Sequence, residues 1–153
     1  MTKRLDKDEY LWSLAFAASK RSTCDRFQGG CVVARHGIVI STGYNGSAPG
    51  EPHCDEAGHE LIHSFPDKGN GEARLHTNFE GIYCIRTIHA EINAIVNAAF
   101  VGVSLRDCDW YITGVPCKAC AMVISRLEPS SIFVCSDQPR TMKDHEKFIN
   151  KWQ

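Results

Sequence analysis

The stretch HAEINAIVNAAF, residues 89–100, begins with a histidine and an acid and continues as a regular helix. Its apolar residues recur at helical spacing: Ile92, Ile95, Val96 and Ala99. The stretch PCKACAMVISRL, residues 116–127, predicts a second helix, because Pro116 lacks an N–H that would have no partner in a first turn. Strands predicted at residues 110–113 and 131–135 flank this helix, so we expect them to run parallel.

The chain before these stretches predicts one helix, a hairpin and a long polar segment. Apolar residues at helical spacing predict a helix over residues 7–21. The β-branched runs at residues 30–35 and 38–44 predict two antiparallel strands joined by a tight turn. Residues 46–81 are rich in Gly, Pro, His and acidic residues and keep no period, so we expect a functional loop there.

The order of these elements predicts an α/β protein. The tail, residues 141–153, reads as a final helix that follows the fourth predicted strand. A mixed central sheet with helices on both faces is the packing that buries all these apolar faces. We therefore expect a three-layer αβα sandwich that forms a single domain over residues 1–153.

Composition narrows the kind of protein. The 153 residues are 43% hydrophobic and 23% charged, which is ordinary for a globular domain that needs no disulfides. No apolar stretch is long enough to span a membrane, and the charged start is unlike a secretory signal, so we expect a cytoplasmic protein (host cytoplasm if viral). The net charge of −1 gives no support to binding of polymeric nucleic acid.

The chain contains eight cysteines and seven histidines, which favours metal binding over disulfides in a protein without a secretory signal. Cys31, Cys108 and Cys135 lie in strand-like contexts, and we interpret them as buried small apolar residues. The other cysteines lie in segments where a metal ligand is the better interpretation.

The two helix starts predict a catalytic zinc site. Cys117 and Cys120 are three residues apart on a helix, so their sulfurs lie on one face, and the helix start favours thiolates. With His89 they give three zinc ligands and one open position, which is typical of catalytic rather than structural zinc. Zinc lowers the pKa of a bound water to about 7, and Glu91, two residues from His89, is placed to move the protons of a hydrolysis.

The spacing H-x-E followed by P-C-x-x-C is the signature of zinc deaminases. Each half alone is a weak signal, but both together, each at a helix start and separated by a strand, are specific. The alternative is a core histidine, a solvated Glu91 and a structural CxxC pair. A purely structural zinc site has no need of an acid beside an open coordination position, so we favour catalysis at a cytosine ring.

Five segments carry a resemblance to a known family: RSTC at 21–24, STGYNGSAPG at 41–50, HCDE at 53–56, CIRTIHAEINAI at 84–95 and YIT at 111–113, which leads into PCKACA. With these segments the chain resembles the deoxycytidylate (dCMP) deaminases of bacteria and phages over roughly residues 10–135. It departs from them at the first strand, which commonly begins VGA and here reads GGC at residues 29–31. Many members also continue to a fifth strand where this tail looks helical.

The resemblance implies a cytidine deaminase-like fold and the hydrolysis of dCMP to dUMP and ammonia, which supplies dUMP for thymidylate synthesis. It also implies a homo-oligomer, usually a hexamer, and in many members activation by dCTP and inhibition by dTTP. The alternatives are a related zinc deaminase that acts on another nucleotide, nucleoside or base, and a non-catalytic zinc-stabilised binding module.

Some family members carry a second, structural zinc, and the matched segments here contain Cys24, Cys54 and Cys84. His59 follows Cys54 by five residues and would complete a closed tetrahedral site. Two further histidines, at positions 53 and 63, are rival fourth ligands. Unlinked cysteines in a loop are the alternative to this site.

Three residues are candidates for binding the substrate. The resemblance implies a substrate role for Asn45, whose amide could bond a sugar hydroxyl, although Asn-Gly pairs most often simply form turns. Arg86 and Arg26 could hold a phosphate, because a guanidinium can donate two hydrogen bonds to one phosphate group. The alternative for each is a solvated charge on the surface. Phe27, Tyr44 and Trp110 could stack on a base, but we expect core packing for each.

Overall fold

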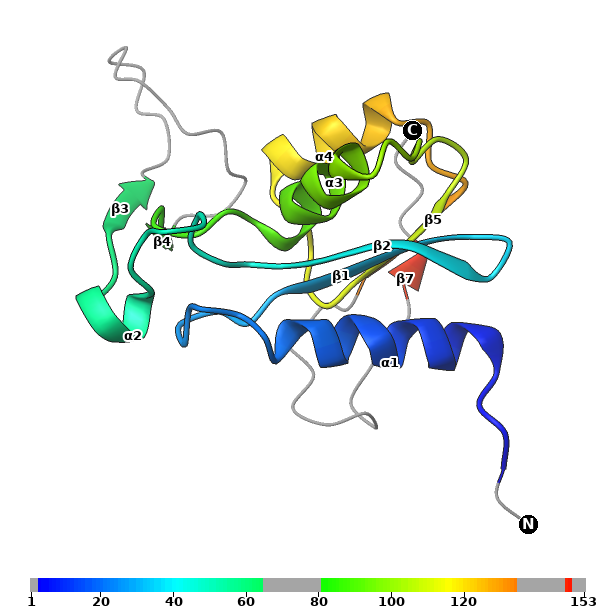
Figure 1. Ribbon diagram of the computed structural model, residues 1–153, viewed down its shortest axis with the longest axis horizontal. Helices are drawn as coiled ribbons and strands as arrows, with labels where there is room; N and C mark the ends of the chain where they lie inside the picture. The colour runs from blue at the N-terminus through cyan, green and yellow to red at the C-terminus, as the bar shows by residue number, and fades with distance from the viewer. Residues whose placement is uncertain (1–2, 65–80, 135–147, 150–153) are drawn as a thin grey trace.

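The computed structural model describes residues 3–64, 81–134 and 148–149. The middle layer is a sheet whose strands lie in the order β2 (Ile38–Tyr44), β1 (Gly30–Arg35), β5 (Asp109–Ile112), β6 (Ser131–Val134) and β7 (Phe148–Ile149). Helix α1 (Lys7–Ser19) covers one face, and α3 (Ala90–Phe100) and α4 (Lys118–Arg126) cover the other (Figure 1). The chain is therefore the three-layer αβα sandwich that the sequence predicts.

The strands pair as a mixed sheet. Strands β1 (Gly30–Arg35) and β2 (Ile38–Tyr44) form an antiparallel hairpin, and β1 also pairs antiparallel with β5 (Asp109–Ile112). Strands β5 and β6 (Ser131–Val134) are parallel and joined through α4. The predicted hairpin and the predicted parallel pair are both confirmed, because the pattern of apolar runs and their connections determined each.

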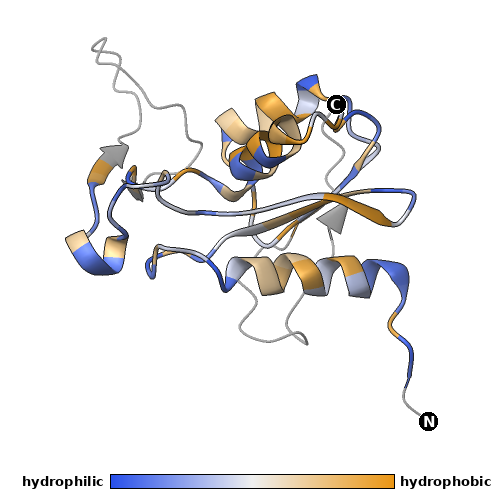
Figure 2. Cartoon of the chain, in the orientation of Figure 1, coloured by the Kyte–Doolittle hydropathy of each residue, from blue (hydrophilic) through white to orange (hydrophobic). Residues whose placement is uncertain are grey.

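Alternation along β1 divides the core into two clusters. Cys31 and Val33 face α3 and α4, while Val32 and Ala34 face α1, as successive strand residues must point to opposite faces. Trp110, on β5, is fully buried in the first cluster. Cys31 and Cys108 are fully buried, as predicted, whereas Cys135 lies outside the described residues. Figure 2 shows that the described N-terminal residues, up to the start of α1, are mostly hydrophilic and so lie outside this core.

Helix α3 sits unusually close to β2. A Cβ atom on Gly43 would lie 2.1 Å from the carbonyl oxygen of Ala90 and 2.5 Å from the nitrogen of Ala94. Only glycine permits this approach, since any side chain would meet backbone atoms. Ser41 Oγ donates to the Ala94 carbonyl at 2.7 Å and fastens the same contact. Together they fix the start of α3, which carries His89 and Glu91, against the sheet.

The segment predicted as one loop at 46–81 contains short regular elements within its described part. Helix α2 (Cys54–Ala57) and strand β3 (Leu61–Ser64) lie there, and β3 pairs antiparallel with β4 (Gly81–Cys84). These elements lie together at one end of the sandwich (Figure 1). The loop prediction was wrong at these residues, because elements this short depend on their partners rather than on a sequence period.

The predicted final helix is also wrong where the structure describes it. Phe148–Ile149 form β7, which pairs antiparallel with β6 and extends the sheet to five strands. A strand of two residues depends on its backbone pairing with β6, which no local sequence period indicates. The rest of the predicted helix, residues 141–147 and 150–153, lies outside the described residues.

Candidate active site

Two neighbouring helix starts bring three metal-binding side chains together. His89 is the N-cap of α3 and Cys117 the N-cap of α4, with Cys120 in the first turn of α4. The Nδ1 atom of His89 lies 3.6 Å from Cys117 Sγ and 3.4 Å from Cys120 Sγ. All three ligand atoms lie within 4.8 Å of one another.

These distances suit a tetrahedral zinc ion. Bonds of about 2.0–2.3 Å at tetrahedral angles place neighbouring ligand atoms roughly 3.3–3.8 Å apart. Hydrogen bonding with Cys120 lowers the pKa of Cys117 well below its usual value, and the hydrogen bond to His89 adds to this effect. One nitrogen and two sulfurs therefore present the donor set, spacing and charge that zinc prefers, and leave a fourth position open.

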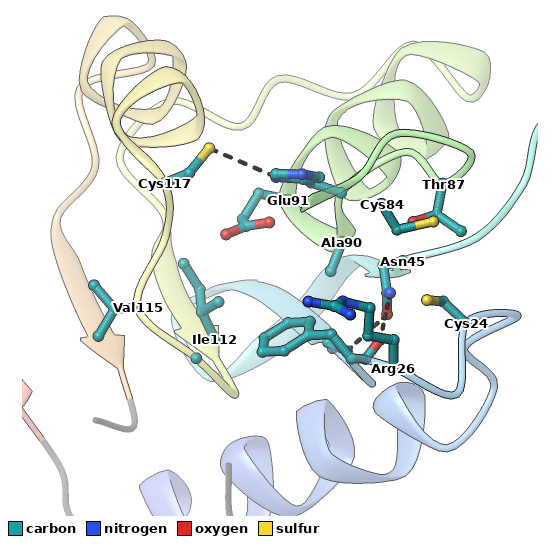
Figure 3. A pocket seen from close by; sticks show the side chains of 15 residues that line it. Cys24, Arg26, Asn45, Cys84, Thr87, Ala90, Glu91, Ile112, Val115 and Cys117 are labelled. Carbon is teal, nitrogen blue, oxygen red and sulfur yellow. Dashed lines mark hydrogen bonds between the residues drawn. The ribbon is translucent and has the colours of Figure 1, made fainter. Parts of the chain in front are cut away.

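Glu91 lies beside this cluster, in the first turn of α3. Its side chain is only 7% exposed, and burial raises the pKa of the carboxyl above its usual value. Figure 3 shows Glu91 and Cys117 pointing toward the same pocket from the two helices. A carboxyl group held in this way can exchange protons with a molecule bound at the open position.

The pocket has a volume of about 500 Å³, enough for a nucleotide. Its lining joins the starts of α3 and α4 to the loop before β1 and to the end of β5. The lining includes Arg26, Phe27, Gly29, Asn45, Glu91 and Gly114.

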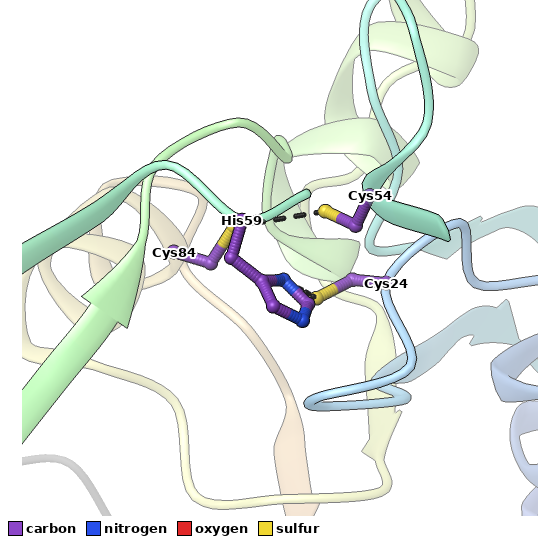
Figure 4. Close-up of side chains that lie close together, drawn as sticks. All are labelled: Cys24, Cys54, His59 and Cys84. Atoms are coloured by element: carbon purple, nitrogen blue, oxygen red, sulfur yellow. Dashed lines mark hydrogen bonds between the residues drawn. The ribbon is translucent and has the colours of Figure 1, made fainter. Parts of the chain in front are cut away.

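A second cluster lies next to this pocket. Cys24, Cys54, His59 and Cys84 point toward one another from separate segments (Figure 4), with all four ligand atoms within 4.8 Å. Cys24 Sγ lies 3.7 Å from His59 Nδ1, and Cys54 Sγ lies 3.7 Å from Cys84 Sγ, which are again tetrahedral spacings. Four donors leave no position open. Cys24 and Cys84 also line the pocket, so this cluster forms one end of it.

The second cluster has its own supporting contacts. Asp25 Oδ1 lies 3.2 Å from His59 Nε2, which orients the ring so that Nδ1 faces the cysteines. Arg86 Nε donates to the Gly58 carbonyl at 2.9 Å and fastens the segment before His59. Of the rival histidines, His53 is exposed at the start of α2, and the side chain of the other, at position 63, lies outside the described residues.

A family model described as the "cytidine and deoxycytidylate deaminase zinc-binding region" matches residues 5–136. The chain belongs to this family. The family is one of zinc-binding deaminases, so zinc is the metal that the Cys/His geometry implies.

Relatives agree with this assignment. The chain is 34% identical over 128 residues to the deoxycytidylate deaminase of Mycobacterium phage D29, covering 80% of this chain and 88% of that one. It is 29% identical over 135 residues to ComE operon protein 2 of Bacillus subtilis, covering 88% of this chain but 62% of that protein. The structure of dCMP deaminase from cyanophage S-TIM5 in apo form has a TM-score of 0.62 at 21% identity, covering 88% and 86% of the two chains, which supports the fold.

In this member of the deaminase family, two of the three predicted substrate-binding residues line the pocket and one does not. Arg26 lines the pocket, whereas Arg86 is absent from the lining and bonds the Gly58 carbonyl instead. Asn45 is 5% exposed and lines the pocket, but its amide also bonds backbone: Oδ1 accepts from Gly29 N at 2.7 Å, and Nδ2 donates to the Phe27 carbonyl at 2.5 Å. Asn45 thus shapes the pocket wall in addition to facing the cavity.

Two residues of the lining were not predicted from the sequence to face a pocket. Phe27 is 46% exposed and faces the pocket, so the expectation of core packing was wrong for it, while it was right for Trp110. Thr87 is buried in the lining, two residues before His89. Proximity to the HAE motif could have indicated Thr87, but no local pattern distinguishes Phe27 from a core aromatic residue.

Proposed function

We propose that this protein hydrolyses dCMP to dUMP and ammonia. The observation that carries the proposal is the buried Glu91 carboxyl in a pocket of about 500 Å³, beside the cluster of His89, Cys117 and Cys120. The deoxycytidylate deaminase of phage D29, at 34% identity, supports the choice of substrate. We further propose that the protein acts in the cytoplasm as a single domain and supplies dUMP for thymidylate synthesis.

The roles of the residues follow from their positions. A zinc ion held by His89, Cys117 and Cys120 would supply a water nucleophile activated at neutral pH. Glu91 accepts a proton from the attacking water and returns it to the departing amino group, because it is the acid that lines the pocket beside the cluster. Burial leaves the Glu91 carboxyl with little contact with bulk water.

We propose that Arg26 holds the 5′-phosphate, since it brings a guanidinium to the pocket. Each charge-assisted hydrogen bond contributes roughly 1.5–3 kcal/mol, so two would raise kcat/KM for dCMP over deoxycytidine by about two orders of magnitude or more. Steady-state kinetics on both substrates under one set of conditions measures this ratio. Equal values, or a preference for deoxycytidine, would defeat the substrate assignment and leave the zinc chemistry standing.

Substitution of Arg26 locates the phosphate contact. Arg26→Gln removes the guanidinium that makes both bonds, so it is expected to lower kcat/KM for dCMP by about two orders of magnitude or more and to leave deoxycytidine nearly unchanged. Arg126→Gln removes the same charge from an exposed position on α4 outside the pocket lining, and serves as the control. A parallel loss with both substrates in Arg26→Gln would show a general structural effect instead of phosphate binding.

We also propose the assembly and regulation that the family resemblance implies, a homo-oligomer activated by dCTP and inhibited by dTTP. Exposed apolar side chains on α3 and α4, such as Phe100 at 84% and Met122 at 60%, support assembly. A second hollow of about 570 Å³, lined by Arg21, Tyr44 and Ser47 among others, supports a further ligand.

Kinetics test this regulation. A plot of rate against dCMP concentration is expected to be sigmoidal. We expect dCTP to shift the curve to lower dCMP concentration and dTTP to shift it to higher concentration. The reason is that the effector site and the active site of an oligomer are coupled when each ligand prefers one of its conformational states. Initial rates with and without each triphosphate, in excess Mg²⁺, give the answer. A hyperbolic curve that neither triphosphate moves would contradict both the assembly and its regulation.

A further inference from the structure

Phe27 is an aromatic residue placed unlike those of the core. Its side chain is 46% exposed and lines the pocket, whereas Trp12 and Trp110 are at most 1% exposed. It lies in the segment between α1 and β1, immediately after Arg26. Removal of an exposed apolar ring from water is favourable, so a ligand that packs against the ring gains binding free energy.

The ring lies across two glycines from distant parts of the chain. A Cβ atom on Gly29 would stand 2.9 Å from Phe27 Cε1, and one on Gly114 would stand 3.0 Å from Phe27 Cζ. Both glycines also line the pocket, Gly114 just after β5. The ring therefore reaches from the segment before β1 to the end of β5, and a side chain at either glycine would displace it.

The backbone that carries the ring is fixed by hydrogen bonds. Asn45 Nδ2 donates to the Phe27 carbonyl and Asn45 Oδ1 accepts from Gly29 N, so one amide holds the residues on both sides of position 28. Ser22 Oγ also donates to the Phe27 carbonyl at 3.3 Å. The backbone at Phe27 is thus held by the protein's own hydrogen bonds, so little ordering of this segment is required when a ligand binds.

We propose that Phe27 forms an apolar wall of the pocket against which the pyrimidine ring of the substrate packs, and that Gly29 and Gly114 are glycines to leave room for it. The inference rests on the proposed function, because it takes a flat heteroaromatic ring as the occupant. Glu91 faces the pocket from α3, while Arg26 and Ile112 lie on the side nearer to β1 and β5 (Figure 3). The wall also gives a physical reason for Gly29, where the first strand of the resembling family commonly begins with valine.

The wall acts on substrate binding rather than on the chemical step, so it changes KM more than kcat. Removal of a ring that stacks on a base weakens binding by about 5- to 150-fold. Phe27→Ala is therefore expected to raise KM for dCMP within that range and to leave kcat within about threefold. Phe27→Tyr keeps the flat ring and is expected to keep KM near that of the wild type.

Gly29→Val tests the contact between ring and glycine directly. The valine is expected to push the Phe27 ring from its place and to raise KM in the wild-type background, but to add little in a Phe27→Ala background. Such coupling between the two substitutions is expected only of residues in contact. Tyr10→Ala, at a similarly exposed aromatic residue on α1 outside the pocket lining, is the control for loss of an exposed ring.

Zinc content and Tm of each variant show whether it folds like the wild type. An unchanged KM in folded Phe27→Ala, or additive effects of Gly29→Val and Phe27→Ala, would overturn the wall. Failure of the wild type to deaminate dCMP would instead overturn the proposed function. In that case the same variants assayed on whichever heterocyclic amine is turned over decide the wall separately.

Discussion

Glu91→Gln is expected to lower kcat for dCMP by roughly 10²–10⁴-fold while zinc content and Tm stay at the wild-type values. The amide nearly matches the carboxyl in size, so the buried side chain at the start of α3 keeps its packing. It cannot accept a proton from water and return it to the leaving group, which removes the general acid–base step. Single-turnover rates, with zinc measured on the same samples, give the comparison.

A matched substitution separates this effect from loss of charge. Glu128→Gln removes a carboxylate at the surface, where it pairs with Arg106 outside the pocket lining. It is expected to leave kcat unchanged. Near wild-type turnover by Glu91→Gln would reject Glu91 as the group that moves protons.

We propose a structural zinc at the cluster of Cys24, Cys54, His59 and Cys84, and expect two zinc ions per chain in the purified protein. Cys54→Ser is expected to lose one of them. A structural zinc contributes folding free energy outright, so a loss of several kcal/mol would lower Tm by roughly 10 °C in a chain of this size. Elemental analysis and thermal unfolding of the same samples measure both effects.

Cys108→Ser is the control for this substitution. Cys108 is fully buried in the core outside both clusters, so its replacement is expected to cost some stability but no zinc. One zinc per chain in the wild-type protein, with Cys24→Ser and Cys54→Ser unaffected, would exclude the second site.

The cluster also forms one end of the pocket, so its loss is expected to raise KM as well.

The elements that fix the active site could be predicted from the sequence because local patterns determine them. Strands 30–35 and 38–44 were predicted with the bounds that the structure gives, since each is an apolar run beside turn residues. The spacing from His89 to Glu91 and from Cys117 to Cys120 placed these residues at two helix starts. Helix geometry puts Cys117 and Cys120 on one face of α4, and the packing of α3 and α4 in one core cluster brings His89 to them.

The parts that the sequence left open depend on contacts between distant residues. Strand β7 is two residues long and exists through its pairing with β6, so no period could reveal it. The sequence alone does not distinguish Arg26 from Arg86 as a phosphate-binding residue. In the folded chain Arg26 lines the pocket, whereas Arg86 bonds the Gly58 carbonyl. Phe27 faces the pocket because Asn45, far along the chain, bonds the backbone on both sides of residue 28.

The most direct test of the account is the release of ammonia by the zinc-loaded protein from dCMP, dCTP, deoxycytidine, CMP and guanine. If the protein is a dCMP deaminase, dCMP is the best of these substrates and yields dUMP and ammonia in equal amounts. Absence of dUMP from dCMP, together with release of ammonia from guanine or deoxycytidine, would contradict the assignment and favour a related deaminase. Absence of ammonia from every compound in the panel would favour a zinc-stabilised binding module instead.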